Sequence, residues 1–225
     1  MKAYILSAVL IISFNSFAQK FGTVTYKINP IQLGTNNTPS ADPLANQVKA
    51  IAESQEFTLT FNDSVSKFEQ KNILSNYDEN LIRLASITFT TEDIFYFNLK
   101  TDVQVIKKID GTLIEIEENS KWTITTENKK IADFQCYKAT RPNFIIDRNG
   151  KEKTLLIIAW FAPSLPYSFG PKGYNGLPGL VLELTDRKTT YLATNISPDN
   201  LDELIIDFQK GKKITEKEYQ NKLRQ

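Results

Sequence analysis

Residues 180–196 read LVLELTDRKTTYLATNI, which is two runs of mainly apolar and β-branched residues around the polar tripeptide Asp186–Lys188. Two such runs joined by a short polar turn are typical of a β-hairpin. The same arrangement recurs upstream, where Asn62–Ser64, Asp110–Gly111 and Asn149–Gly150 each separate two short strand-like runs. Asn, Asp and Gly suit the tight turns that join paired strands. Sequence neighbours are therefore expected to pair in antiparallel order.

Two other runs alternate between apolar and polar residues. Thr23–Ile28 alternates Thr and Lys with Val, Tyr and Ile, and Phe57–Phe61 alternates Phe and Leu with Thr. Alternation of this kind predicts strands with one buried face, because successive side chains point to opposite sides of a sheet. Ile94–Leu99 is apolar at most positions instead, so this strand is expected to lie centrally and to be covered on both faces.

A helix is expected to begin at Pro43. Asp42 can cap its N-terminus, and proline suits the first turn because the amide hydrogen that it lacks would have no partner there. Leu44, Val48 and Ile51 then fall on one face at the helical period.

A second helix is expected over Glu216–Arg224. Thr215 followed three residues later by Glu218 forms the capping-box pattern, and Tyr219 and Leu223 are spaced to rest on the body of the protein. Together these patterns predict a mainly β fold. We expect a curved antiparallel sheet or open barrel with one helix near the N-terminus and one at the C-terminus.

The start of the chain has the composition of an export signal. Lys2 is followed by an apolar run to Phe14, and the small residues Ser16 and Ala18 precede the expected cleavage site after Ala18. This pattern predicts a secretory signal peptide over residues 1–18, because the run is shorter than the roughly 20 apolar residues that a spanning helix needs. Residues 19–225 are then expected to form a single β-rich domain with no membrane span after cleavage.

Composition excludes several classes of function. The 225 residues include 27 Lys and Arg, 26 Asp and Glu, no His and one Cys. A net charge of +1 provides no field that would attract nucleic acid, so no nucleic-acid partner is expected. The absence of histidine excludes Ser-His, Cys-His and His-ligated metal chemistry, and the acidic clusters lack the spacing of a calcium loop. We therefore expect no catalytic residues, no metal and no cofactor, and we expect the lone Cys136 to be buried.

The segment Trp160–Gly179 differs from the rest of the chain because prolines, glycines and aromatic residues follow one another closely. It predicts a shaped loop followed by a strand, with residues 176–179 making the turn. Either the loop is a binding surface on a rigid scaffold, or its aromatic side chains fold inward and plug one end of the barrel. The candidate binding residues are Trp160, Phe161, Tyr167, Phe169, Tyr174, Asn175 and Leu177.

A possible modification site lies in the turn at Asn62–Ser64. Asp63-Ser64-Val65 resembles the short acceptor pattern for O-linked glycans in some periplasmic proteins. Ser64 is therefore a candidate for modification at a surface turn.

Gly176–Val181 reads GLPGLV and resembles the signature of the GLPGLI family of exported proteins, with Val181 in place of the final isoleucine. Tyr174, Glu183 and the Gly170–Pro171 pair are similar to that family's usual positions. The resemblance implies an exported envelope protein, in the periplasm or on the outer surface of a Gram-negative bacterium, and it implies no reaction. Further landmarks similar to the family's are Trp122–Ile124, Lys130–Ile131, Cys136–Ala139, Ala159–Phe161 and Ile214–Glu216.

Two functional hypotheses remain. In the first, the protein is a non-enzymatic envelope binding or accessory protein whose loop Trp160–Gly179 contacts an envelope protein or an apolar small ligand. In the alternative, it is a periplasmic carrier that shelters a lipid-like or other apolar ligand in a half-open barrel. Alternating strands permit such a cavity, because inward side chains can line it as easily as fill it. The sequence indicates no oligomeric state.

Overall fold

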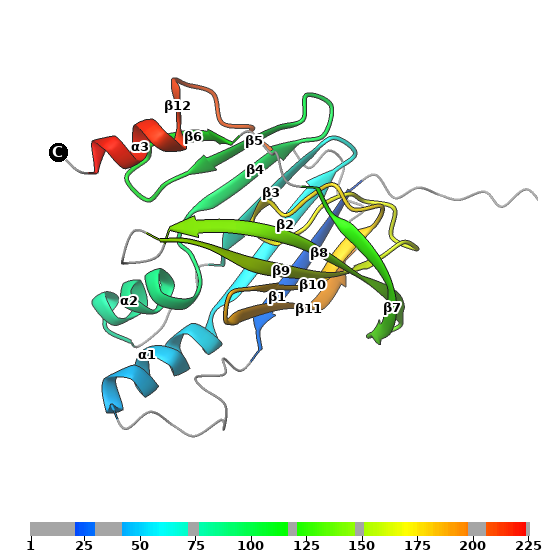
Figure 1. The fold of residues 1–225 in the computed structure, drawn as a ribbon, viewed down its shortest axis with the longest axis horizontal. Helices are drawn as coiled ribbons and strands as arrows, with labels where there is room; N and C mark the ends of the chain where they lie inside the picture. The colour runs from blue at the N-terminus through cyan, green and yellow to red at the C-terminus, as the bar shows by residue number, and fades with distance from the viewer. Residues whose placement is uncertain are drawn as a thin grey trace, which may run out of the picture.

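The computed structural model describes residues 21–29, 42–71, 77–116, 121–146, 151–197 and 206–223, which form a mainly β fold (Figure 1). The helices are α1 (Pro43–Ser54), α2 (Glu79–Phe89) and α3 (Glu216–Lys222), and η1 (Pro171–Gly173) is a single 3-10 turn. The strands are β1 (Phe21–Ile28), β2 (Glu56–Asn62), β3 (Val65–Gln70), β4 (Ile94–Asn98), β5 (Val103–Lys107), β6 (Leu113–Ile116), β7 (Thr123–Ile131), β8 (Phe134–Ile146), β9 (Glu152–Ala162), β10 (Leu180–Asp186), β11 (Thr189–Ser197) and β12 (Lys213–Thr215).

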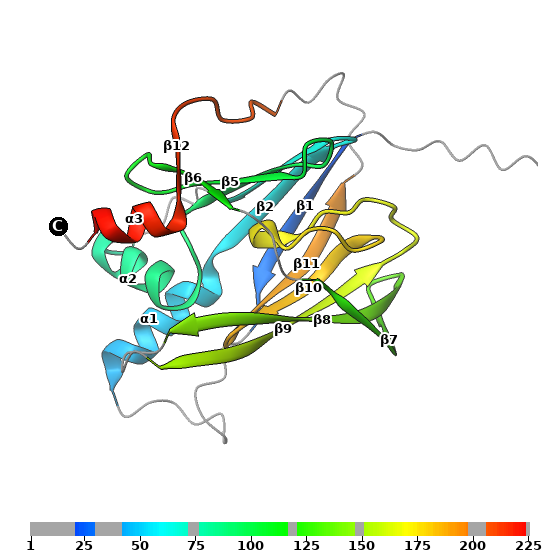
Figure 2. The same cartoon turned by 45° about the horizontal axis from the view of Figure 1, so that its top comes forward.

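All twelve strands belong to one sheet, in the order β12-β6-β5-β4-β3-β2-β1-β11-β10-β9-β8-β7. β1 lies between two meanders, β2 to β6 on one side and β7 to β11 on the other. Every neighbouring pair is antiparallel except β12 and β6, which are parallel. The sheet curves strongly, and within the described residues its end strands β12 and β7 do not pair (Figures 1 and 2). The predicted curved, open sheet is confirmed.

An aromatic core fills the inside of the curve. Tyr26, Phe57, Phe68 and Tyr191 are buried side chains of this core. The Phe57 ring stacks on Phe68 with centroids 5.5 Å apart and meets Tyr191 edge-on at 5.2 Å. The Tyr26 hydroxyl donates a hydrogen bond of 2.6 Å to the Val181 carbonyl, so β1 is fastened to β10 through the core. Burial raises the pKa of Tyr26 far above its usual range.

The first helix begins where the sequence predicted. The Asp42 carboxylate accepts a hydrogen bond of 2.9 Å from the Leu44 amide, which caps α1, and Pro43 occupies the first turn. Val48 and Ile51 are buried in the core. Leu44 is exposed, so the expected apolar face is shorter than predicted.

A helix between β3 and β4 was not expected, and the prediction of only two helices is corrected by α2. Asp78 caps it by accepting hydrogen bonds from the Asn80 and Leu81 amides, at 2.8 and 3.3 Å. Ala85 and Ser86 are buried on its inner side. α2 packs against α1, and the pair covers one end of the core (Figure 1).

The C-terminal helix has the predicted capping box, in which Thr215 and Glu218 exchange hydrogen bonds. Tyr219 is buried, as expected, and the Lys108 ammonium lies 5.5 Å from its ring centroid. Leu223 is exposed, and the expectation that it rests on the body is wrong. It is the C-cap residue that follows the last residue of α3, where its side chain remains in solvent.

The strand predicted to be covered on both faces is β4. Phe95 and Phe97 belong to the main core, whereas Tyr96 belongs to a second cluster together with Val105 of β5. Phe208, from the segment before β12, packs on this second cluster, with its ring centroid 6.1 Å from that of Tyr96. The chain therefore covers the outer face of its own sheet here.

The turns predicted at Asn62–Ser64, Asp110–Gly111 and Asp186–Lys188 join the expected strands. The signal peptide over residues 1–18, the turn Asn149–Gly150 and the end of the last helix at Arg224 lie outside the described residues.

Candidate functional site

The loop between β9 and β10 lies inside the curve of the sheet (Figure 2). Phe161, Phe169 and Leu177 are fully buried in the main core. The Phe169 ring contacts Phe61 of β2 and Phe97 of β4, with centroid distances of 5.7 and 6.3 Å. The loop therefore contacts the opposite half of the sheet through Phe169, in the inward arrangement that the sequence left as one of two alternatives.

Asn175 fastens the loop to itself and to the segment before β7. Its side-chain oxygen accepts a hydrogen bond of 3.0 Å from the Gly170 amide, and its carbonyl accepts one of 2.8 Å from the Trp122 indole. The bond from Gly170 fixes the orientation of the side-chain amide, because only its oxygen can accept a hydrogen bond. The buried Nδ2 has no hydrogen-bond partner among the described residues.

Two glycines of this segment, Gly179 of the signature and Gly170 before it, are required by backbone contacts. A Cβ on Gly179 would lie 2.4 Å from the Ala162 carbonyl oxygen, and a Cβ on Gly170 would lie 2.4 Å from the Tyr174 carbonyl oxygen. Beyond the turn, the Leu180 amide donates to the Leu165 carbonyl at 2.9 Å. The loop thus returns against its own chain at distances that only glycine permits.

A cleft of about 1210 Å³, which we call the mouth cleft, lies between the two halves of the sheet. Its walls come from α2 and the segment after it, from β4 to β6, from β8 and β9, from η1 and from the turn between β10 and β11. A second cleft of about 350 Å³, the loop cleft, is lined by Asn175–Pro178 and by Trp122. Gln104, Arg141 and Gly173 line both. The Gln104 side chain lies directly against Gly173 and so helps to separate the two clefts.

An ion pair between Lys172 and Asp186 lies in the wall of the mouth cleft. Asp186 is only 6% exposed, and its second oxygen has no hydrogen-bond partner among the described residues. The same is true of the Tyr191 hydroxyl, whose ring lies 5.8 Å from the Lys172 ammonium. Burial, with the Asp186 charge nearby, raises the pKa of Tyr191 well above its usual value. The phenol therefore stays protonated.

Arg141 of β8 is the charged residue that the two clefts share. It is 8% exposed, and its guanidinium carbon lies 4.6 Å from the Tyr174 ring centroid and 5.1 Å from that of Trp122. Cation–π contacts of this kind hold the guanidinium plane in place and contribute most when water is excluded. Its positive charge is thereby held at the junction of the clefts.

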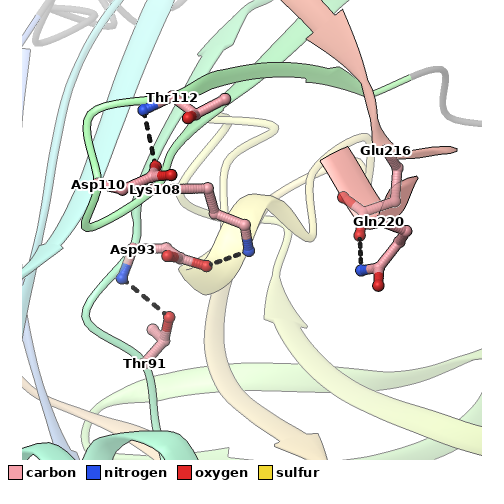
Figure 3. A network of polar contacts seen from close by, with 7 residues as sticks. All are labelled: Thr91, Asp93, Lys108, Asp110, Thr112, Glu216 and Gln220. Carbon is pink, nitrogen blue, oxygen red and sulfur yellow. Dashed lines mark hydrogen bonds and ion pairs between the residues drawn. The ribbon is translucent and has the colours of Figure 1, made fainter. Parts of the chain in front are cut away.

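Short polar contacts organise the rim on the side of β4 to β6 (Figure 3). The Lys108 ammonium lies 2.7 Å from an Asp93 carboxylate oxygen, and the Asp93 amide donates to the Thr91 hydroxyl at 3.0 Å. Next to them, Asp110 accepts from the Thr112 amide at 2.9 Å. The Thr112 hydrogen bonds, with Lys222 nearby, lower the pKa of Asp110 to about 2.

Four of the seven predicted binding residues line neither cleft, namely Trp160, Phe161, Tyr167 and Phe169. The Trp160 ring lies 4.4 Å from the Lys129 ammonium, which also pairs with Glu183 at 2.7 Å. The Tyr167 ring packs on Phe61 with centroids 4.7 Å apart. The structure therefore brings Tyr174, Asn175 and Leu177 to the clefts and leaves the other four predicted residues outside them.

Ser64 lies in the turn between β2 and β3. Its amide donates to the Asn62 side-chain oxygen at 2.9 Å, and its carbonyl accepts from the Leu99 amide at 2.7 Å. The side chain is half-buried, and its modification stays a prediction.

Sequence reasoning missed the charged residues of the mouth cleft. Arg141 lies two residues after Ala139, so both side chains point to the same face of β8. This spacing was the available signal that Arg141 faces the inside of the sheet. Ala139 is fully buried and Arg141 nearly so. Lys172 and Asp186 carried no such signal, because each lies next to a turn and such positions are normally solvated.

Comparison with known families gives one match. A family model described as "Protein of unknown function (Porph_ging)" matches residues 146–183. This segment contains the whole loop Trp160–Gly179 and the whole signature Gly176–Val181, so the match is consistent with the resemblance noted in the sequence. No curated protein matches the chain.

The described residues provide neither a metal-binding cluster nor a membrane-spanning helix. Within the ranges given above, no group of three or more acidic or cysteine side chains is placed to hold a metal ion. In the same part of the chain, no helix has the length and apolar character to cross a bilayer.

Proposed function

We propose that the protein is an exported, non-enzymatic binding protein of the bacterial envelope, and that its ligand lies in the mouth cleft. The observation that carries this proposal is the cleft itself. Its volume of about 1210 Å³ exceeds the roughly 300–1,000 Å³ typical of small-ligand pockets. Export to the periplasm or outer surface is supported by the sequence of residues 1–18 and by the family resemblance.

The carrier hypothesis is supported by how this space is bounded. Phe95 and Ile106 contribute apolar surface from one half of the sheet, and Leu155 contributes it from the other. Because the sheet does not close, the space is a cleft rather than a sealed cavity. A carrier must both load and release its ligand, and an open side provides one route for both.

The accessory-protein hypothesis is supported by a different surface. Phe144 is 72% exposed and Leu156 is 56% exposed, although both are large and apolar. Phe144 pairs with Thr154 and Pro142 pairs with Leu156, so the two apolar side chains are diagonal neighbours on one face of β8 and β9. Neither lines the mouth cleft or the loop cleft. Such a pair is a candidate contact for an envelope protein.

The test is native mass spectrometry of the mature protein, purified gently from its own envelope. A bound small molecule that is lost on denaturation is the expected result. Leu155→Trp places a bulky side chain in the wall of the mouth cleft and should reduce the share of protein that carries the added mass. Leu156→Trp is the matched control, because it makes the same change at the next residue, outside the cleft.

The outcomes separate the hypotheses. An empty wild-type protein, or equal retention of the ligand in Leu155→Trp and Leu156→Trp, would contradict binding in the mouth cleft. A co-purifying protein that is lost in a variant with serine at Phe144 and Leu156 would favour the accessory function. Thermal unfolding of each variant checks that the fold is retained.

A further inference from the structure

We infer that the ligand of the mouth cleft is an amphiphile with an anionic head and an apolar chain. This inference rests on the proposed function and adds the chemical class of the ligand. The mouth cleft combines positive charge with apolar surface.

Positive charge is concentrated in the mouth cleft. Over the whole chain, 27 basic residues are nearly balanced by 26 acidic ones. The cleft lining instead has seven basic and four acidic side chains. The basic ones are Arg83, Lys108, Arg141, Lys153, Lys172, Arg187 and Lys188, and the acidic ones are Glu92, Asp93, Asp186 and Glu216.

Two of these acids are already neutralised by cations of the same cleft, Asp93 by Lys108 and Asp186 by Lys172. Arg83, Lys153 and Lys188 are exposed and have no ion-pair partner among the described residues. They come from three elements, namely α2, β9 and the turn between β10 and β11. An anionic group in the cleft is therefore approached by cations from more than one wall.

Apolar surface surrounds the same space. Ile87 of α2 is 72% exposed and Ile109, in the turn between β5 and β6, is 61% exposed, and both line the mouth cleft. Phe95 and Ile106 continue this surface inward. Large apolar side chains that remain in water beside a cleft are typical of a binding site.

The two properties together select the ligand class. A neutral apolar molecule leaves the cations without a partner, and a compact anion such as inorganic phosphate leaves the apolar walls in water. A molecule with one anionic head and an apolar chain satisfies both. The head can be a carboxylate or a phosphate, because Lys and Arg bind either.

The test titrates the delipidated mature protein with decanoate, with the chain-matched neutral decanol and with inorganic phosphate, by calorimetry at neutral pH. We expect decanoate to bind about tenfold more tightly than decanol at low salt, since three exposed charge pairs contribute roughly two- to threefold each. Raising the salt from about 0.1 M to 1 M shortens the Debye length from about 10 to 3 Å and should remove this preference.

A triple variant, Arg83→Gln with Lys153→Gln and Lys188→Gln, should reduce decanoate binding about tenfold and leave decanol binding unchanged. The control variant removes three exposed lysines that line neither cleft, at Lys100, Lys130 and Lys217. It has the same net charge as the test variant, so a general loss of positive charge would affect both equally.

Equal binding of decanol and decanoate would overturn the anionic head and leave the proposed function standing. Phosphate that displaces decanoate and binds as tightly would overturn the apolar chain. If none of the probes binds but native mass spectrometry still finds a ligand, the inferred class is wrong and the proposed function survives. Equal loss in the two triple variants would also contradict the inference.

Discussion

Replacing Gly179 with alanine should destabilise the protein far more than replacing Gly176, although both glycines belong to the same signature. Gly176 has φ +87° and nothing within 4 Å of an added Cβ. Alanine at Gly176 is strained by the positive φ, which destabilises the folded state by about 1–2 kcal/mol. Alanine also makes the unfolded chain less flexible, which offsets about 0.4–1 kcal/mol of this loss. We therefore expect a net loss of roughly 1 kcal/mol.

Gly179 also has positive φ, +157°, but here an added Cβ would meet backbone. It would lie 2.4 Å from the Ala162 oxygen, 2.7 Å from the Ala162 carbonyl carbon and 2.9 Å from the Pro163 nitrogen. Backbone atoms cannot rotate away, so an overpacking cost of about 1–3 kcal/mol adds to the strain. The expected loss for Gly179→Ala is about 3 kcal/mol or more.

Urea denaturation of the mature protein measures the free energy of unfolding of both variants. The values are compared with the same slope m of free energy against urea concentration. For a chain of this size, 1 kcal/mol corresponds to about 2–4 °C in Tm, so Gly179→Ala should lower Tm by at least about 6 °C. Gly176→Ala should lower it by about 2–4 °C. If Gly179→Ala is no more destabilising than Gly176→Ala, the close return of the loop onto Ala162 is not what requires glycine.

Three further predictions follow from buried or hydrogen-bonded groups. Tyr26→Phe removes the hydrogen bond to the Val181 carbonyl and should cost about 1–2 kcal/mol in urea denaturation, whereas an unchanged midpoint would mean that the bond adds nothing. Burial raises the pKa of the Cys136 thiol to about 11. A reagent that reacts with thiolates should therefore label the native protein slowly and the urea-unfolded protein quickly at mildly alkaline pH. Equal labelling rates in the two states would contradict the raised pKa. Because the folded state favours the protonated thiol, the contribution of Cys136 to the free energy of unfolding is complete below about pH 9 and declines as the pH rises toward 11. The Asp110 carboxyl carbon should titrate in an NMR experiment with a pKa of about 2, because the Thr112 hydrogen bonds favour the charged form, and an ordinary midpoint would contradict it.

The strands were predictable because their signals are local. Alternation over Thr23–Ile28 and Phe57–Phe61 identifies a buried face without any knowledge of the partner strand. The capping residues Asp42 and Thr215 are equally local, since each acts on the amides that follow it. These features depend only on sequence neighbours, and the structure confirms them.

α2 was missed for a local reason. Its β-branched residues Ile82, Ile87 and Thr88 favour strand, which obscures the helical spacing of Leu81 and Ala85. The charge at Asp78 just before the run was the available signal for a helix N-terminus.

The mouth cleft could not be predicted, because its walls are contributed by parts of the chain that no pattern connects. Arg141, Lys172 and Gln104 meet there only after the sheet has curved. The sequence did single out the loop, and the family match falls on it. The loop's aromatic residues prove to pack inside, next to the cleft rather than on an outer surface.

The position of β1 has a consequence for how the ligand site forms. β2 to β6 and β7 to β11 are meanders, so most of their pairs join neighbouring strands of the chain and can form as soon as both have been made. β1 pairs at Thr23 with Thr60 of β2 but also with Ser197 of β11, near the opposite end of the chain. The second pairing closes the longest loop in the fold, which makes it the slowest contact to form. It is also the contact that joins the two halves between which the mouth cleft lies. In refolding, the ability to bind ligand should therefore appear with the last kinetic phase, after most of the strand signal has already returned.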